Sequence, residues 1–132
     1  MLKKLGHIGI AVNNIEKVLE QFSKILKKPM PAIKDNKQMK VKTAMIHFNG
    51  IGFEILQPYG ESGMLAEYVK EKGNGIHHFC FISDSLENDM EELKNIGFAF
   101  RQEKPAKGVR GKLRATTKDD ALDGIPFEIS EP

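Results

Sequence analysis

The chain has 132 residues, of which 40% are hydrophobic and 29% are charged, and its formal net charge at pH 7 is +2. This length and composition are typical of one domain with a sizeable core, and so small a charge does not favour nucleic acid as a partner. No apolar run approaches the roughly 20 residues that span a bilayer, which argues against a membrane protein. The single cysteine, Cys80, excludes an internal disulfide and a thiolate metal cluster, so we expect a cytoplasmic location.

The first part of the chain is predicted to form a strand, a helix and three further strands. Alternation over 5–12 predicts the first strand, with His7 on the face opposite the isoleucines. An apolar stripe at helical spacing then predicts a helix with Asn13 as its N-cap, ending before Pro29. The remaining strands are expected near 30–35, 40–48 and 51–57, the last after a turn at Asn49-Gly50.

A connector and a second series of elements follow. Residues 58–74 are expected to hold a short helix that Ser62 caps and Gly73 closes. After it, a strand over 76–82 leads to a helix with Asp84 as its N-cap. Three more strands are predicted near 98–102, 111–117 and 125–130.

The two series also match residue by residue. When His78 is placed over His7, the residues that follow fall into step, and GIGFEI before the connector matches GIPFEI near the end. Neither series could cover both faces of its own sheet. We therefore predict one α+β domain in which two paired βαβββ modules form a curved, partly closed mixed sheet with the helices outside. The modules are expected at about 1–57 and 75–132, joined by the connector at about 58–74.

Each module carries one histidine on its first strand and one glutamate on its last. The histidines share their strand faces with small residues, and the glutamates alternate with apolar residues, where a carboxylate is costly to bury without a compensating cation. Two imidazoles and two carboxylates suit a divalent ion such as Zn²⁺, Co²⁺, Ni²⁺ or Mn²⁺. The matched pairs therefore predict one metal site with four ligands: His7, Glu54, His78 and Glu128.

Each of these features has a simpler structural interpretation. The histidines would then be hydrogen-bonded core residues, and the glutamates would face solvent. Cys80 is interpreted as a packing residue rather than a nucleophile, because no base is evident beside it. The segment 104–112 concentrates cations among glycines, and it suits either a solvated hairpin or a loop that holds phosphates.

Together these motifs resemble the vicinal oxygen chelate superfamily of glyoxalases and bleomycin-resistance proteins, and within it the methylmalonyl-CoA epimerases. The similarity runs nearly end to end, through HIGIAV, NNIE, FEILQP, GNGIHHF and GIPFEIS. The resemblance implies a homodimer and a divalent metal in a cleft between the modules, held by the four ligands named above.

The resemblance also implies an activity, the movement of the proton α to a thioester carbonyl, most similar to methylmalonyl-CoA epimerisation. Glu128 is the candidate catalytic base, and Lys107, Arg110 and Lys112 are candidate contacts to the CoA phosphates. Thr43 stands where some epimerases have a second carboxylate, so we expect a substrate contact there rather than a base. The alternatives are a glyoxalase I-type lyase acting on thiol adducts and a metal-free drug-binding module, and the ligand set argues against the second.

Overall fold

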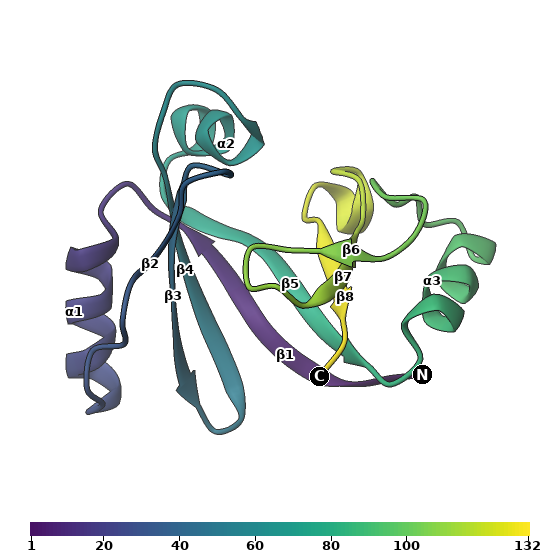
Figure 1. The fold of residues 1–132 in the computed structure, drawn as a ribbon, viewed down its shortest axis with the longest axis horizontal. Helices are drawn as coiled ribbons and strands as arrows, with labels where there is room; N and C mark the ends of the chain where they lie inside the picture. The colour runs from purple at the N-terminus through teal and green to yellow at the C-terminus, as the bar shows by residue number, and fades with distance from the viewer. The chain divides into compact units, whose positions relative to one another are not determined.

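The computed structural model describes residues 1–132 (Figure 1). In chain order the elements are β1 (Leu2–Ala11), α1 (Ile15–Leu26), β2 (Lys34–Asn36), β3 (Val41–Phe48), β4 (Ile51–Pro58), α2 (Met64–Lys72), β5 (Gly75–Ser83), α3 (Leu86–Asn95), β6 (Ala106–Lys107), β7 (Leu113–Thr116), a 3₁₀ turn (Ala121–Asp123) and β8 (Phe127–Ser130). The strands form one sheet in the order β2-β3-β4-β1-β5-β8-β7-β6, and it is mixed because β5 and β8 are parallel. The predicted α+β fold with two βαβββ modules is confirmed. No helix is long and apolar enough to cross a membrane.

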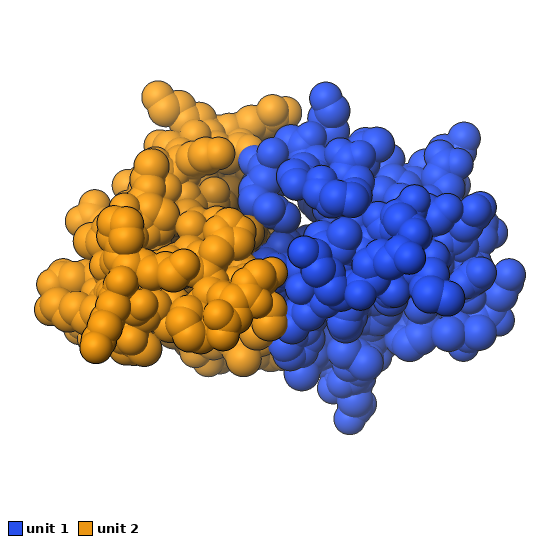
Figure 2. Space-filling view, turned by 90° about the horizontal axis from the view of Figure 1, so that it is seen from below, with its two compact units in different colours: residues 1–7, 78–132 blue, residues 8–77 orange.

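The residues group into two compact units, which Figure 2 colours separately. Unit 1 contains residues 1–7 and 78–132, and unit 2 contains residues 8–77. The division passes through β1 and β5, so each of these strands contributes residues to both units.

In unit 2, α1 packs against β3 and β4. Those two strands form a hairpin in which Phe48 pairs with Ile51. Asn49 and Gly50 both have positive φ, 51° and 80°, as the two central residues of a type I′ turn require, so the predicted turn is confirmed. The buried residues of the helix and of the chain packed against it form one cluster: Val12, Ile15, Leu19, Ala44 and Ile55.

In unit 1, α3 packs against β8. The side chains between them have the apolar character expected of a core, and several are aromatic. The buried members of this cluster are Met90, Phe100, Ala115, Ala121, Phe127 and Ile129.

The three predicted N-caps are wrong by one residue each. Helix α1 is capped by Asn14, whose side chain accepts a hydrogen bond from the backbone N–H of Lys17. The N-cap position of α3 is occupied by Ser85, and the Asp84 carboxylate instead forms an ion pair with Lys3 at 3.1 Å. This contact also lowers the pKa of Asp84.

The helix of the connector ends as predicted and begins one residue later than its expected cap. Gly73 closes α2 with a φ of 74°, and its N–H donates to the carbonyl of Val69. The N-cap position is occupied by Gly63, which follows the predicted Ser62 and provides no side-chain hydrogen bond.

The strand predicted near 98–102 is wrong. Phe100 makes only an isolated bridge with Thr117. The ladder stops there because the side chain of Gln102 accepts the hydrogen bond from the N–H of Thr116, 2.9 Å away. The strand that pairs with β7 is instead β6, in which Ala106 and Lys107 lie opposite Arg114 and Leu113.

Candidate functional site

Two buried histidines meet within unit 1. His7 lies on β1 and is 2% exposed, and His78 lies on β5 and is 5% exposed. Their Nε2 atoms are 3.2 Å apart, and the ring planes are nearly perpendicular, at 84°. The alternation of both strands places each histidine on the same face as small residues, as the sequence predicts.

Glu128 completes this cluster from the neighbouring strand. Because β5 and β8 are parallel and in register, Glu128 lies opposite Cys80, two residues beyond His78. Its Oε1 atom is 3.6 Å from Nε2 of both His7 and His78. We call these three residues the His–His–Glu cluster.

The second carboxylate oxygen of Glu128 has partners of its own. Thr116 lies directly opposite Glu128 on β7, and its Oγ1 donates to Oε2 over 3.4 Å. The Nε atom of Arg114 is 3.8 Å from the same oxygen. Glu128 therefore directs one oxygen to the histidines while the other is held by β7.

The cluster fits a divalent ion. At metal–ligand bonds of about 2.1 Å, two donor atoms on one ion lie roughly 3.0–3.6 Å apart, and the three separations among these atoms are 3.2, 3.6 and 3.6 Å. Imidazole and carboxylate donors suit the borderline divalent ions. Cys80 is fully buried, and its sulfur lies within 4.8 Å of ligand atoms of His7 and Glu128. It therefore packs beside the cluster and adds a soft donor there.

Arg110 contacts the other side of the His7 ring. Its Nη2 atom lies 3.2 Å from Nδ1 of His7. A guanidinium only donates, so Nδ1 accepts and the neutral ring carries its proton on Nε2. Nε2 of His78 lies within hydrogen-bond distance of that nitrogen. Binding an ion through Nε2 of His7 requires this proton to leave and Arg110 to give up its hydrogen bond.

The other two predicted cations of this hairpin do not join the cluster. Lys107 is on β6 and Lys112 is in the turn before β7, and both are exposed and form no ion pair. The turn is closed by backbone hydrogen bonds, from Gly108 to the carbonyl of Lys112 and from Gly111 to that of Gly108. Only Arg110 of the predicted phosphate-binding residues therefore approaches a histidine.

Two predicted site residues belong to unit 2. Glu54 is on β4, is 3% exposed and pairs with Met45. Thr43 is on β3, is 5% exposed and lies between Lys34 and Leu56 in register. The burial of Glu54 agrees with a carboxylate that is compensated. Its role as a ligand and the role of Thr43 as a substrate contact stay predictions.

Two residues beside Glu128 are not identified by the sequence. Thr116 and Arg114 become neighbours of Glu128 only through the pairing of β7 with β8. Nothing in the local pattern of β7 marks them, since the repeat that reveals the histidines and glutamates does not extend to this strand.

Comparison with known proteins identifies the family. The model of the glyoxalase/bleomycin resistance protein/dioxygenase superfamily matches residues 6–116. The ethylmalonyl-CoA/methylmalonyl-CoA epimerase of Cereibacter sphaeroides is 28% identical over 133 aligned residues, which cover 99% of each chain. A hypothetical protein of Bacillus halodurans has a solved structure with a TM-score of 0.89 and 31% identity, covering 98% of this chain and 94% of that one. A methylmalonyl-CoA epimerase solved with methylmalonyl-CoA and NH₄⁺ has a TM-score of 0.88 and 20% identity, covering 99% and 95%. The chain belongs to the glyoxalase/bleomycin resistance protein/dioxygenase superfamily.

Proposed function

We propose that this protein is a metal-dependent epimerase that moves the proton α to the thioester carbonyl of an acyl-CoA, with methylmalonyl-CoA as its substrate. The observation that carries this proposal is the convergence of Nε2 of His7, Nε2 of His78 and Oε1 of Glu128 within 3.2–3.6 Å. The similarity to an ethylmalonyl-CoA/methylmalonyl-CoA epimerase over 99% of both chains supports the choice of substrate.

The two histidines and Glu128 would hold the ion, and the sequence repeat adds Glu54 as the fourth ligand. A divalent ion bound there supplies positive charge beside the thioester oxygen, where negative charge develops when the α-proton leaves. Co²⁺, Zn²⁺, Ni²⁺ and Mn²⁺ all accept such a ligand set.

Glu128 is the proposed base. Its side chain is 17% exposed, so substrate can reach it, whereas the histidines beside it are nearly closed to solvent. Thr116 holds Oε2 and so fixes the direction of the carboxylate. The carboxylate takes the C2 proton and leaves an enolate. A second acid on the opposite face of C2, in exchange with water, then delivers a proton there and gives the other epimer. Glu128 releases the proton it took to water, so atoms and charge balance.

The test is solvent exchange at C2. One epimer of methylmalonyl-CoA is incubated in D₂O with the protein and each of the four ions, and deuterium at C2 is followed by NMR. We expect exchange and inversion that require the ion, and a fall of about 10²–10⁴-fold in Glu128→Gln. Glutamine keeps an oxygen donor, so this variant separates loss of the base from loss of the ion. Glu103→Gln, an exposed position before β6, is the matched control.

Two outcomes would replace the proposal. Turnover of the hemithioacetals of methylglyoxal without any C2 exchange would indicate a glyoxalase I-type lyase. Tight binding of a small molecule with neither reaction would indicate a drug-binding module.

A further inference from the structure

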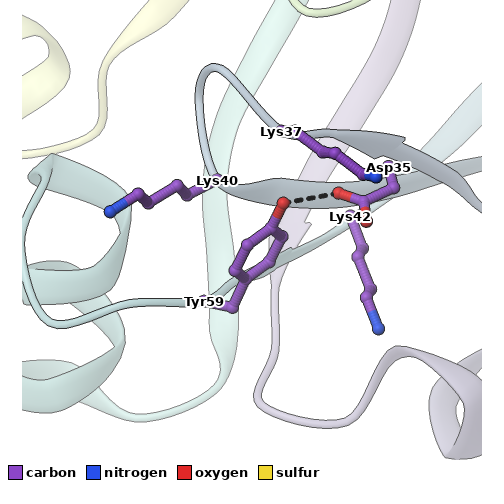
Figure 3. Close-up of a pocket in the computed structure, with 5 residues that line it drawn as sticks. All are labelled: Asp35, Lys37, Lys40, Lys42 and Tyr59. Carbon is purple, nitrogen blue, oxygen red and sulfur yellow. Dashed lines mark hydrogen bonds between the residues drawn. The ribbon is translucent and has the colours of Figure 1, made fainter.

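A second candidate site lies wholly within unit 2, at the hairpin of β2 and β3. It is a pocket of about 590 Å³ lined by Asp35, Lys37, Lys40, Lys42 and Tyr59. A volume of this order is in the range of small-molecule sites. Figure 3 shows the Tyr59 hydroxyl directed at Asp35 and the end of Lys37 near that carboxylate, whereas Lys40 and Lys42 extend away from the ring in different directions.

The backbone around the pocket is well defined. The side chain of Asn36 accepts a hydrogen bond from the N–H of Met39 over 2.9 Å, which closes the turn. Lys40 then adopts a φ of 53°, and its carbonyl accepts the N–H of Tyr59 over 2.9 Å. The stem of Lys40 lies over Gly60, where an added Cβ would meet it at 3.2 Å. The end of β4 is therefore tied to the β2–β3 turn.

The pocket has an excess of positive charge. The hydroxyl of Tyr59 donates to Asp35 over 2.6 Å. This bond raises the pKa of Tyr59, and it keeps the Asp35 carboxylate occupied. None of the three lysines forms an ion pair. Three ammonium groups less one carboxylate leave a charge of +2 around the pocket.

We propose that this pocket binds a phosphate-class anion, with diphosphate as the group that fits it. Lysine ammonium groups are common phosphate partners that act as point charges on flexible stems. Three lysines line this pocket, and their stems allow the ammonium groups to turn toward a group with several charged oxygens. A single carboxylate would leave most of this charge and volume unused. The same chemistry has two sources, free diphosphate and the 3′-phospho-ADP end of a CoA ester.

The ordinary alternative is a solvated lysine-rich hairpin. It predicts that anions interact with these lysines no more strongly than with others at the surface. The two interpretations therefore differ in whether affinity depends on these particular positions, and that difference can be measured without turnover or divalent ions.

Inorganic pyrophosphate is titrated calorimetrically into the whole protein at low ionic strength, without added divalent ion. We expect saturable binding that the Lys40→Ala/Lys42→Ala variant weakens at least 10-fold and that added salt weakens by screening. The charge-matched control is Lys17→Ala/Lys28→Ala, which removes two exposed lysines of the α1 region and should leave the dissociation constant within 2-fold. Equal losses in the two variants, or no binding by the parent protein, would overturn the proposal.

A pair of substitutions with opposite expected signs separates binding from folding. Asp35→Asn removes the one negative charge of the pocket and should strengthen pyrophosphate binding about 3-fold or more. Tyr59→Phe leaves the Asp35 carboxylate without its hydrogen bond from the phenol, and this variant should bind pyrophosphate more weakly. Loss of affinity in both variants would show that the pocket is only structural, which contradicts the proposal.

A second titration with 3′-phospho-ADP identifies the source of the anion. Tighter binding than pyrophosphate, lost in the same lysine variant, supports the nucleotide end of a CoA ester. Binding of pyrophosphate alone supports free diphosphate. Neither result depends on the His–His–Glu cluster, so the pocket and the proposed epimerase activity can fail separately.

Discussion

The two units place the repeat-matched glutamates in different environments. Glu54 on β4 of unit 2 is 3% exposed, whereas the side chain of Glu128 on β8 of unit 1 is 17% exposed. Glu128 also has Thr116 and Arg114 beside its second oxygen. The difference teaches that two copies of one motif suit different tasks. A buried carboxylate is suited to holding a cation, and a solvent-accessible carboxylate is suited to contacting the substrate.

The basic hairpins of the two units also differ, in what their positively charged side chains contact. In unit 1, the β6–β7 hairpin directs Arg110 onto Nδ1 of His7. In unit 2, the β2–β3 hairpin keeps Lys37, Lys40 and Lys42 around a pocket in which Tyr59 occupies the only carboxylate. Both hairpins are basic, and in unit 1 the arginine contacts a buried histidine.

The largest expected effect separates the two glutamates. Glu128→Gln should lower C2 exchange by about 10²–10⁴-fold at saturating divalent ion, because the amide cannot accept the proton. Glu54→Gln should act on the ion instead and raise its dissociation constant, so that excess ion restores most of the exchange. Exchange rates measured across an ion titration distinguish these cases. Equal losses in both variants, with no rescue by the ion, would show that the difference in exposure has no functional meaning.

The next effect compares the two cores. Leu19 in unit 2 and Ile129 in unit 1 are both 0% exposed, so Leu19→Ala and Ile129→Ala should each cost about 2–5 kcal/mol of unfolding free energy. Denaturant unfolding measures both. Ile25→Ala, at a position 73% exposed on α1, should change stability by less than about 0.5 kcal/mol. A core variant no less stable than this control would show that its unit is packed differently.

A substitution of Arg110 tests whether the β6–β7 hairpin restrains His7. Arg110→Ala removes a hydrogen bond that competes with ion binding at His7, and a bond of this kind is worth about 0.5–1.5 kcal/mol. The dissociation constant for the divalent ion should therefore fall by about 2–10-fold, while the Michaelis constant for a CoA ester rises. Lys112→Ala on the same hairpin should leave ion binding unchanged. Unaltered ion affinity in Arg110→Ala would mean that the guanidinium does not restrain the ring.

The smallest effect concerns how α1 and α3 begin. Asn14 caps α1 through its side chain, whereas Ser85 before α3 makes no side-chain cap. Asn14→Ala should cost about 1 kcal/mol of unfolding free energy and Ser85→Ala only a few tenths. Thermal unfolding of the two variants provides the comparison, and a larger loss from Ser85→Ala would contradict it.

Much of the fold can be predicted from the sequence because each pattern of strands, helix and motif residues occurs twice. A single histidine or glutamate is ambiguous, but the same pair in two modules identifies the residues that the structure brings together around His7, His78 and Glu128. The caps were wrong by one residue because neighbouring cap formers compete, as with Asn13 and Asn14. Backbone geometry and a tertiary contact decide between them.

The rest depends on contacts that a linear pattern does not contain. Gln102 ends one strand by taking the N–H of Thr116 with its side chain, and no periodicity reveals this. Arg110 reaches His7 across 103 positions of the chain. The lysine pocket forms only when Tyr59 folds back on Asp35. The expected homodimer also stays a prediction.

The most direct test of the central claim is the metal content of two double variants. The chain has four histidines, so His7→Ala/His78→Ala can be matched by His47→Ala/His77→Ala, which removes the other two. After dialysis against Co²⁺ or Zn²⁺, the parent protein and the control should each retain about one ion per chain by elemental analysis. His7→Ala/His78→Ala should retain none at the same free ion concentration, since it removes two proposed ligands. Equal occupancy in the two variants would show that the His–His–Glu cluster is not a metal site.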